Sequence, residues 1–144
     1  RFVNNFNKLP DYLKKCIVIE NDDKVFNVSD TLKISDMINV PIVLDYHHYK
    51  CNKSDIDIER IFKTWNIKPK LHFSSPKSKK NFRSHSDYIN SDDFIEFIEF
   101  IKKYNTDVDI MLETKMKDEA LFRLVRELKY KTNYNFIDDT SFEI

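Results

Sequence analysis

Val40-Pro-Ile-Val-Leu-Asp45 is a run of apolar residues that ends in a carboxylate. Three other stretches have the same form, an apolar run followed by a residue that can bind a metal, at residues 16–20, 69–72 and 108–113. A continuous apolar run is typical of a strand covered on both faces, as in parallel sheets. Amphipathic stretches lie between the runs. Repeated strand–helix units predict a parallel sheet, because parallel strands need a crossover connection.

Hydrophobic spacing predicts where each element lies. Strands are expected at residues 16–19, 40–44, 70–73 and 108–112, and helices at 28–38, 56–65, 94–104 and 117–129. Ser29 or Asp30 is a suitable N-cap for the first of these helices. Residues 1–12 resemble the end of a helix and a connection, residues 74–90 a long polar loop, and residues 130–144 have no predicted structure.

Four strand–helix units are half of an eight-unit TIM (β/α)8 barrel, which takes about 250 residues. We therefore expect an α/β fold made of about four βα units. A half barrel leaves open sheet edges, which are a liability for a free protein. Missing N-terminal strands, a truncated gene or dimerisation would each close the sheet.

The composition excludes several classes of protein. Charged residues make up 33% and hydrophobic residues 41% of 144 residues, as in ordinary globular domains. Glycine is absent, which excludes Gly-rich phosphate loops and hence kinases, GTPases and NAD enzymes. The net charge of +0 means that a nucleic acid would be met by a local patch only. No signal or membrane segment is visible, and Cys16 and Cys51 are expected to be reduced thiols, so a cytoplasmic location is predicted.

Chemistry in parallel sheets lies at the carboxyl ends of the strands. Six residues could reach one such mouth and bind a divalent metal: Glu20, Asp45, His48, His72, His85 and Glu113. Carboxylate and imidazole together suit Mn, Zn and Fe. Each residue alone has an ordinary alternative, such as a helix cap or a solvated histidine. The occurrence of all six residues at one mouth favours a metal site.

Two further features concern phosphate and bases. Lys70 shares a strand face with His72, because side chains alternate along a strand. Beside metal ions, the Lys70 side chain would be neutralised, carbamylated or bound to phosphate. As the first residue of the strand, Lys70 could instead point to solvent. The loop after this strand carries four cations that could hold a nucleic-acid backbone: Lys77, Lys79, Lys80 and Arg83. Aromatic residues near the same mouth could stack on bases or pack inside the barrel: Tyr46, Tyr49, Phe73 and Phe82.

At these residues the chain resembles the UV damage endonuclease family (the UvsE/UVDE type). The matching segments, in the family's order, are Ile19-Glu-Asn-Asp-Asp23, Val40-Pro-Ile-Val-Leu-Asp-Tyr-His-His48, Lys70-Leu-His-Phe-Ser-Ser-Pro76, Arg83-Ser-His-Ser-Asp-Tyr-Ile89 and Asp109-Ile-Met-Leu-Glu-Thr-Lys-Met-Lys-Asp118. Together they cover nearly the whole chain, and the combination is specific.

The resemblance implies a TIM barrel similar to endonuclease IV, of which residues 1–144 would be the C-terminal half. It implies a metal-dependent DNA repair endonuclease that nicks UV-damaged double-stranded DNA on the 5′ side of photoproducts, with a cluster of divalent ions, typically manganese. The metal ligands carried over by position are Glu20, Asp45, His48, His72, His85 and Glu113. Register favours His48 over His47, and Tyr49 stands where members often have a third histidine.

The resemblance also implies catalytic roles for Lys70, which matches a lysine that can be carbamylated, and for Glu113. Lys77, Lys79, Lys80, Arg83 and Tyr46 would contact DNA. The family draws further histidine ligands from an N-terminal half, and no segment of this chain matches it. The isolated chain is therefore expected to be incomplete.

Two other functions remain open from the sequence. A metal-dependent sugar isomerase or epimerase also places Glu, Asp and His at barrel strand ends, although the basic loop favours phosphate over a neutral sugar. An inactive half-barrel that acts as a binding module is the other.

Overall fold

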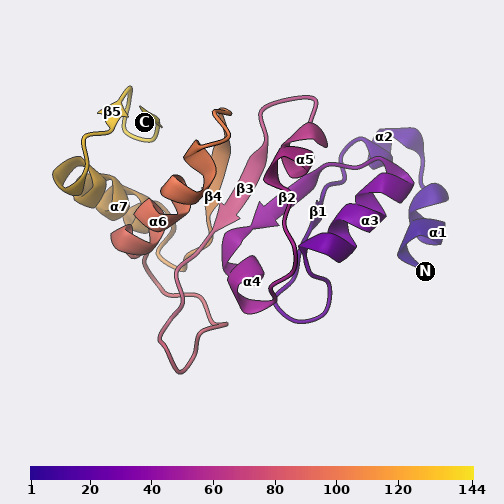
Figure 1. The fold of residues 1–144 in the computed structure, drawn as a ribbon, viewed down its shortest axis with the longest axis horizontal. Helices are drawn as coiled ribbons and strands as arrows, with labels where there is room; N and C mark the ends of the chain where they lie inside the picture. The colour runs from indigo at the N-terminus through magenta and orange to yellow at the C-terminus, as the bar shows by residue number, and fades with distance from the viewer. The chain divides into compact units, whose positions relative to one another are not determined.

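The computed structural model describes residues 1–144 and divides them into two compact units. The first unit comprises residues 1–72 and 107–110, and the second comprises residues 73–106 and 111–144. The first unit holds α1 (Phe2–Asn7), α2 (Asp11–Lys14), β1 (Ile19–Glu20), α3 (Val28–Ile38), β2 (Ile42–Asp45), α4 (Tyr46–Cys51) and α5 (Ile58–Lys63) (Figure 1). Strands β3 (Lys70–Phe73) and β4 (Asp109–Leu112) each begin in the first unit and end in the second. The second unit holds α6 (Ser91–Lys102), α7 (Lys117–Lys131), β5 (Asn135–Phe136) and β6 (Phe142–Glu143).

The main sheet has the strand order β1-β2-β3-β4. Strands β1 and β2 pair in parallel with Glu20 opposite Val43, and β2 and β3 pair in parallel with Asp45 opposite His72. Helices separate consecutive strands in the chain, as a parallel sheet requires. The predicted α/β class and parallel sheet are therefore confirmed, and the half barrel stays a prediction.

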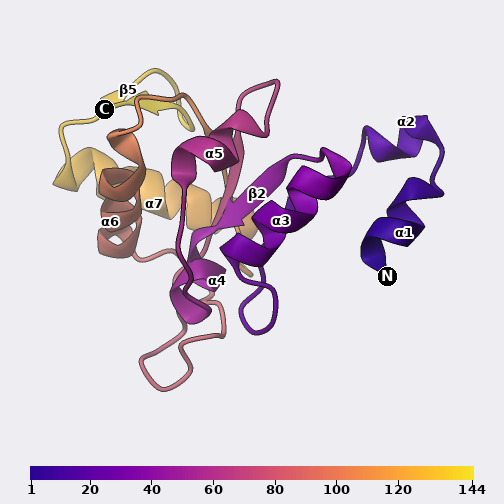
Figure 2. The ribbon, with the colours of Figure 1, turned by 45° about the vertical axis from the view of Figure 1, so that its right-hand side comes forward.

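In the first unit, α3 packs along β1 and β2 (Figure 2). All four residues of β2 are buried, including the charged Asp45. Val28 and Leu32 of α3 are buried as well. Burial on both faces explains why β2 is a continuous apolar run in the sequence.

In the second unit, the core is aromatic. The rings of Phe73 and Phe97 stack with their centroids 5.0 Å apart, and Phe94 meets Phe73 edge-on at 5.2 Å. Helix α7 contributes Leu124 and Leu128, which are both buried. The antiparallel hairpin β5–β6 adds the stacked pair of Tyr134 and Phe142.

Several boundaries agree with the sequence and several differ. Helix α3 and strand β3 have the predicted bounds. The N-cap of α3 is Asn27, whose side chain accepts the N–H of Asp30, and not Ser29 or Asp30. Strand β1 begins only at Ile19, because Cys16 lies in the turn that closes α2, where its N–H donates to the carbonyl of Leu13.

Three residues other than glycine have positive φ: Asn39 at 53°, Asn105 at 46° and Lys117 at 45°. Asn39 ends α3 in the left-handed region, and its N–H donates to the carbonyl of Ser35. This is the position that glycine most often occupies at a helix end. In a chain without glycine, asparagine takes it, because asparagine tolerates the left-handed region better than most residues do.

Both cysteines are free thiols, as predicted. None of the helices is both long enough and apolar enough to cross a membrane.

Candidate metal centre

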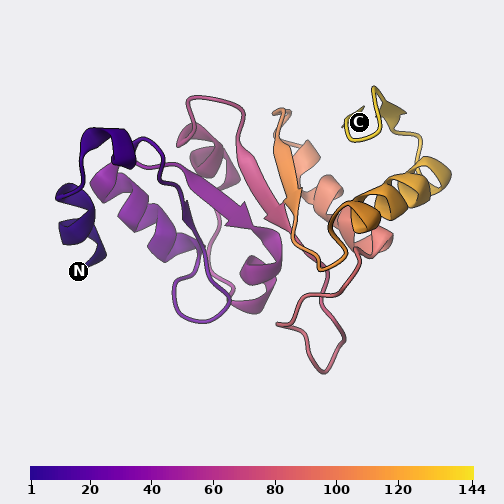
Figure 3. The same ribbon diagram turned by 180° about the vertical axis from the view of Figure 1, so that it is seen from behind.

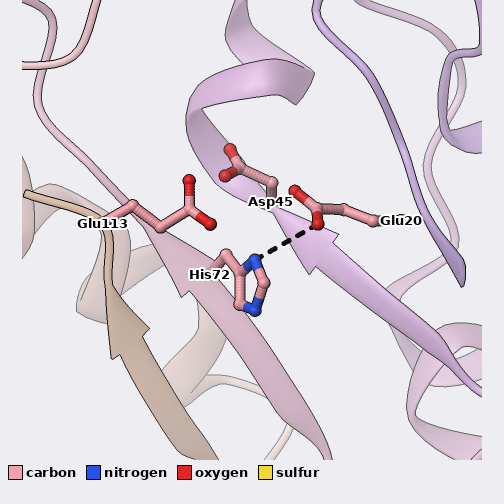
Figure 4. Close-up of side chains that lie close together, drawn as sticks. All are labelled: Glu20, Asp45, His72 and Glu113. Atoms are coloured by element: carbon pink, nitrogen blue, oxygen red, sulfur yellow. Dashed lines mark ion pairs between the residues drawn. The ribbon is translucent and has the colours of Figure 1, made fainter. Parts of the chain in front are cut away.

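The candidate centre forms at the carboxyl ends of β1, β2 and β3. Glu20 and Asp45 are the last residues of β1 and β2, and His72 lies opposite Asp45 in the register. Neighbouring strands lie about 4.8 Å apart, so side chains on the same face at these ends meet. Glu20, Asp45 and His72 each offer one ligand atom, and these atoms lie within 4.8 Å of one another (Figure 4).

Asp45 is the most buried member of this cluster. Its side chain is fully buried and caps α4, because Oδ1 accepts the N–H of His48 at 2.6 Å. A buried carboxylate is costly unless cations or hydrogen-bond donors compensate its charge. The cap therefore fixes the Asp45 side chain at the strand end but supplies only part of that compensation.

Two histidines face Glu20. Nδ1 of His48 lies 3.3 Å from Oε1 of Glu20 and 3.8 Å from Oδ2 of Asp45, and Nδ1 of His72 lies 3.3 Å from Oε2 of Glu20. Nδ1 of His48 is also 3.0 Å from the carbonyl oxygen of Asn21. These three neighbours of Nδ1 are acceptors, so Nδ1 carries hydrogen and Nε2 is the ring nitrogen that a neutral His48 would offer to a metal.

These contacts shift two pKa values in opposite directions. The hydrogen bond to Glu20, together with the charge of Asp45, raises the pKa of His48 to about 9, although burial opposes the shift. Burial acts to raise the pKa of Glu20, but hydrogen bonds and charge from His48 and His72 outweigh it and lower this pKa to about 2. At neutral pH without a metal, a carboxylate and an imidazolium therefore face each other.

Asn21 ties the ends of β1 and β2 together. Its Nδ2 donates to the carbonyl of Asp45, and its Oδ1 accepts the N–H of Asp45, both at 3.0 Å. Asn21 is almost fully buried. Sequence reasoning did not single it out as a site residue, although an amide directly after a strand-end carboxylate was the available signal. The reciprocal pair positions Asp45 beside Glu20.

Helix α4 separates the neighbouring histidines. His48 faces Glu20, whereas His47 is fully buried and its Nε2 lies 3.8 Å from Sγ of Cys51. Tyr46 is only 6% exposed, and Lys50 covers its ring at 5.0 Å. The start of α4 thus buries most of the Tyr46 side chain, and its contact with DNA stays a prediction.

The donor set fits a divalent cation. Two carboxylates and imidazole nitrogens suit Mn, Zn and Fe, and the buried charge of Asp45 would be compensated by a cation. His48 has the arrangement usual for a metal-bound histidine, with the other ring nitrogen on a carbonyl or carboxylate.

Glu113 and His85 meet within the second unit. Glu113 follows the last residue of β4, and its N–H donates to the carbonyl of Phe73 at 2.9 Å. Nδ1 of His85 lies 3.6 Å from Oε2 of Glu113. A bridge between Pro76 and His85 holds the histidine at the base of the long loop. The structure thus pairs two of the predicted ligands, and both side chains are partly buried.

Lys70 has a partner outside the cluster. It lies on the same face of β3 as His72, as strand alternation predicts, while Leu71 and Phe73 are buried on the other face. Its ammonium forms an ion pair with Asp109 at the start of β4. The hydrogen bond from Lys70 lowers the pKa of Asp109. A carbamylated Lys70 would be anionic and would lose this partner.

The basic loop lies at the surface of the second unit. Lys77, Lys79, Lys80 and Arg83 are all exposed. The N–H of Lys77 donates to the carbonyl of Ser84 at 2.7 Å, which closes the loop below the lysines. The four cations therefore extend from one loop that its own backbone holds together.

The fold and the strand-end cluster define an α/β protein with a metal-type site at the carboxyl edge of a parallel sheet. The model of the family described as UV-endonuclease UvdE matches residues 1–143, so this chain belongs to that family. Proteins named UV DNA damage endonuclease are similar to it: the one from Bacillus cereus (strain G9842) is 47% identical over 135 residues, 89% of this chain and 43% of that protein. The one from Bacillus velezensis (strain DSM 23117 / BGSC 10A6 / LMG 26770 / FZB42) is 42% identical over 136 residues, 89% of this chain and 42% of that protein.

A solved structure, described as the crystal structure of SacUVDE, has a similar fold. The TM-score is 0.78 at 34% identity, over 90% of this chain and 45% of that chain. The chain therefore spans less than half the length of the relatives that it matches.

Proposed function

We propose that this chain forms the C-terminal half of a TIM-barrel endonuclease that uses divalent metal ions to nick DNA on the 5′ side of UV photoproducts. Membership of the UvdE family and the similarity to proteins named UV DNA damage endonuclease support the endonuclease activity. The observation that carries the metal dependence is the approach of Glu20, Asp45 and His72 to within 4.8 Å of one another.

In this proposal, Glu20, Asp45, His48 and His72 hold metal ions from the first unit. His85 and Glu113 complete the ligand set from the end of β4 and the loop after β3. Manganese suits these oxygen and nitrogen ligands. A divalent ion held there would lower the pKa of a bound water and polarise the phosphodiester. The hydrogen bonds of Asn21 and the cap at α4 keep the carboxylates in position before substrate arrives.

The lysines would hold the flanking DNA backbone. Lys77, Lys79, Lys80 and Arg83 are exposed on one loop, where phosphate oxygens can reach them. A catalytic contact between Lys70 and phosphate requires its ammonium to exchange Asp109 for a phosphate oxygen. These exposed cations favour a nucleic acid over the neutral substrate of a sugar isomerase, whose binding would depend little on salt.

The remainder of the barrel would close the sheet beside β1 and β4. The match to 45% of the SacUVDE chain supports this division of the barrel. The missing half would come from the same protein or from a second polypeptide.

The test is a nicking assay on the longest available form of the protein, with Mn²⁺ and a labelled duplex that carries one photoproduct. We expect a nick 5′ of the photoproduct that is abolished by EDTA and absent on undamaged duplex. Glu113→Gln should abolish nicking and leave the circular dichroism spectrum unchanged, because it removes a charged ligand without changing side-chain size. Nicking by this variant at the wild-type rate would refute the ligand assignment.

A further inference from the structure

The loop between β1 and α3, residues 21–27, carries two apolar side chains to the surface. Val25 is 65% and Phe26 is 61% exposed. The loop lies beside α4 at the end of the sheet toward which β2 runs (Figures 1 and 3). Neither side chain belongs to the core or to the metal ligands. Two adjacent exposed apolar residues at the mouth of a candidate site therefore need an explanation.

The shape of this loop is fixed from within by Asp22. Its carboxylate accepts the N–H groups of Lys24, Val25 and Phe26 at 2.5 to 3.0 Å. Its own N–H donates to the carbonyl of Phe26 at 2.8 Å, and Asn52 Nδ2 donates to its carbonyl. Most of the hydrogen bonds that hold Val25 and Phe26 outward thus come from within the loop, and Asn52 adds one from outside it.

The loop begins at the metal cluster. Asp22 follows Glu20 by two residues, so their Cα atoms are at most about 7 Å apart. Phe26 N lies 3.0 Å from the Asp22 carboxylate. A phosphodiester held at Glu20 would therefore have its neighbouring nucleotides within reach of Phe26.

The charge beside the apolar pair indicates the kind of partner. Lys24 is exposed next to Val25. Lysine is depleted at the buried centres of protein interfaces but contacts phosphates in nucleic-acid complexes. Aromatic side chains stack on bases, and apolar side chains enter base steps and partly unstack them. An apolar tip with an adjacent ammonium matches a nucleotide, which combines an apolar face with a phosphate.

We propose that residues 24–26 form a DNA contact beside the cleaved phosphodiester, in which Phe26 stacks on a nucleobase, Val25 packs against its sugar or the next base, and Lys24 pairs with a flanking phosphate. The proposal rests on the proposed endonuclease function and adds a base contact to it from within this chain.

The test uses the longest available form of the protein and the photoproduct duplex, labelled for fluorescence anisotropy, with Ca²⁺ in place of Mn²⁺ to limit cleavage. Phe26→Ala should weaken binding by about tenfold or more, the usual effect of removing a stacked ring. Phe26→Tyr should restore most of the affinity because it keeps a ring.

Met37→Ala is the matched control, because Met37 is 66% exposed on α3 but lies at the helix end away from this loop. It should bind as the wild type does. Equal affinity for Phe26→Ala, Met37→Ala and wild type, with normal nicking by all three, would overturn the base contact alone. A wild type that neither binds nor nicks the duplex would overturn the endonuclease function and this proposal with it. A change in oligomeric state with Phe26→Ala, measured by light scattering, would assign the loop to assembly and overturn the DNA contact.

Discussion

The connections that follow β1 and β3 leave equivalent ends of parallel strands but differ in chemistry. The loop after β1 is short, is held by the Asp22 carboxylate and exposes Val25 and Phe26. The loop after β3 is long, is closed by bonds such as that from Lys77 to Ser84, and exposes lysines. An apolar contact is insensitive to salt, whereas a contact made by ammonium groups weakens as salt rises. Contacts made by the two loops are therefore expected to respond differently to salt.

The largest difference should appear when the lysines of the second loop are removed. Lys77→Ala, Lys79→Ala and Lys80→Ala together should lower the salt slope of duplex binding by about 2.7, since each phosphate contact contributes about 0.9. Binding is measured by anisotropy over a series of salt concentrations. Alanine at Lys8, Lys33 and Lys63, which are exposed on the first unit, makes the same change in net charge. If the salt slope of duplex binding falls equally in both triple variants, the loop after β3 has no particular part in DNA binding.

A smaller difference should appear in the free energy of unfolding when one asparagine of each loop is replaced by alanine. Asn21→Ala removes two buried hydrogen bonds to the backbone of Asp45 and should lower the free energy of unfolding by about 1–3 kcal/mol. Asn81→Ala alters an exposed side chain and should change it by less than about 0.5 kcal/mol. Urea unfolding followed by circular dichroism measures both. Equal destabilisation would mean that the clamp at Asp45 contributes nothing specific.

The smallest difference should be a response to acid. Burial acts to raise the pKa of Asp22, but hydrogen bonds from the amides of Val25, Lys24 and Phe26 outweigh it and hold this pKa below 3.8. The carboxylate therefore stabilises the loop fully above pH 3.8, and this contribution is lost as the pH falls through the lowered pKa. NMR shifts of the three amides should follow this titration.

The variant Asp22→Asn is the control for the acid response. In Asp22→Asn the three amide shifts should stay flat, because the amide side chain does not titrate. The amide of Lys77 in the second loop should also stay flat, since its acceptor is the carbonyl of Ser84. Titration of the first-loop amides in Asp22→Asn would assign the acid response to another group.

Periodic patterns made much of this fold predictable. Helix α3 and strand β3 follow from their apolar spacing, because their burial matches a helical period and a strand alternation. Helix α4 is not predicted by the apolar spacing, since Tyr46 to Cys51 has no apolar stripe and the helix begins at the cap made by Asp45. The hairpin β5–β6 is held by tertiary contacts of Phe142 with other rings, which no local pattern reports.

The candidate site was predictable to a similar extent. Strand-end position marked Glu20, Asp45 and His72, because parallel strands bring their carboxyl ends to one edge. The sequence could not show that Asp109 pairs with Lys70, because this ion pair depends on the register of β4 beside β3. Nor could the sequence show that Asn21 reaches the backbone of Asp45, since that contact joins the residue after β1 to the last residue of β2, 24 positions further along the chain.

The absence of glycine, which leaves positive φ angles to Asn39, Asn105 and Lys117, also restricts the backbone of the unfolded chain. At a typical usage of about 7%, roughly ten glycines would be expected in a chain of this length. A residue with a side chain has fewer backbone conformations to lose on folding than glycine has. Where its native angles are allowed, it raises the free energy of unfolding by about 0.4–1 kcal/mol relative to glycine. Residues with negative φ therefore lose less backbone entropy on folding than glycine would, whereas Asn39, Asn105 and Lys117 adopt the left-handed conformation that is unfavourable for residues with a side chain.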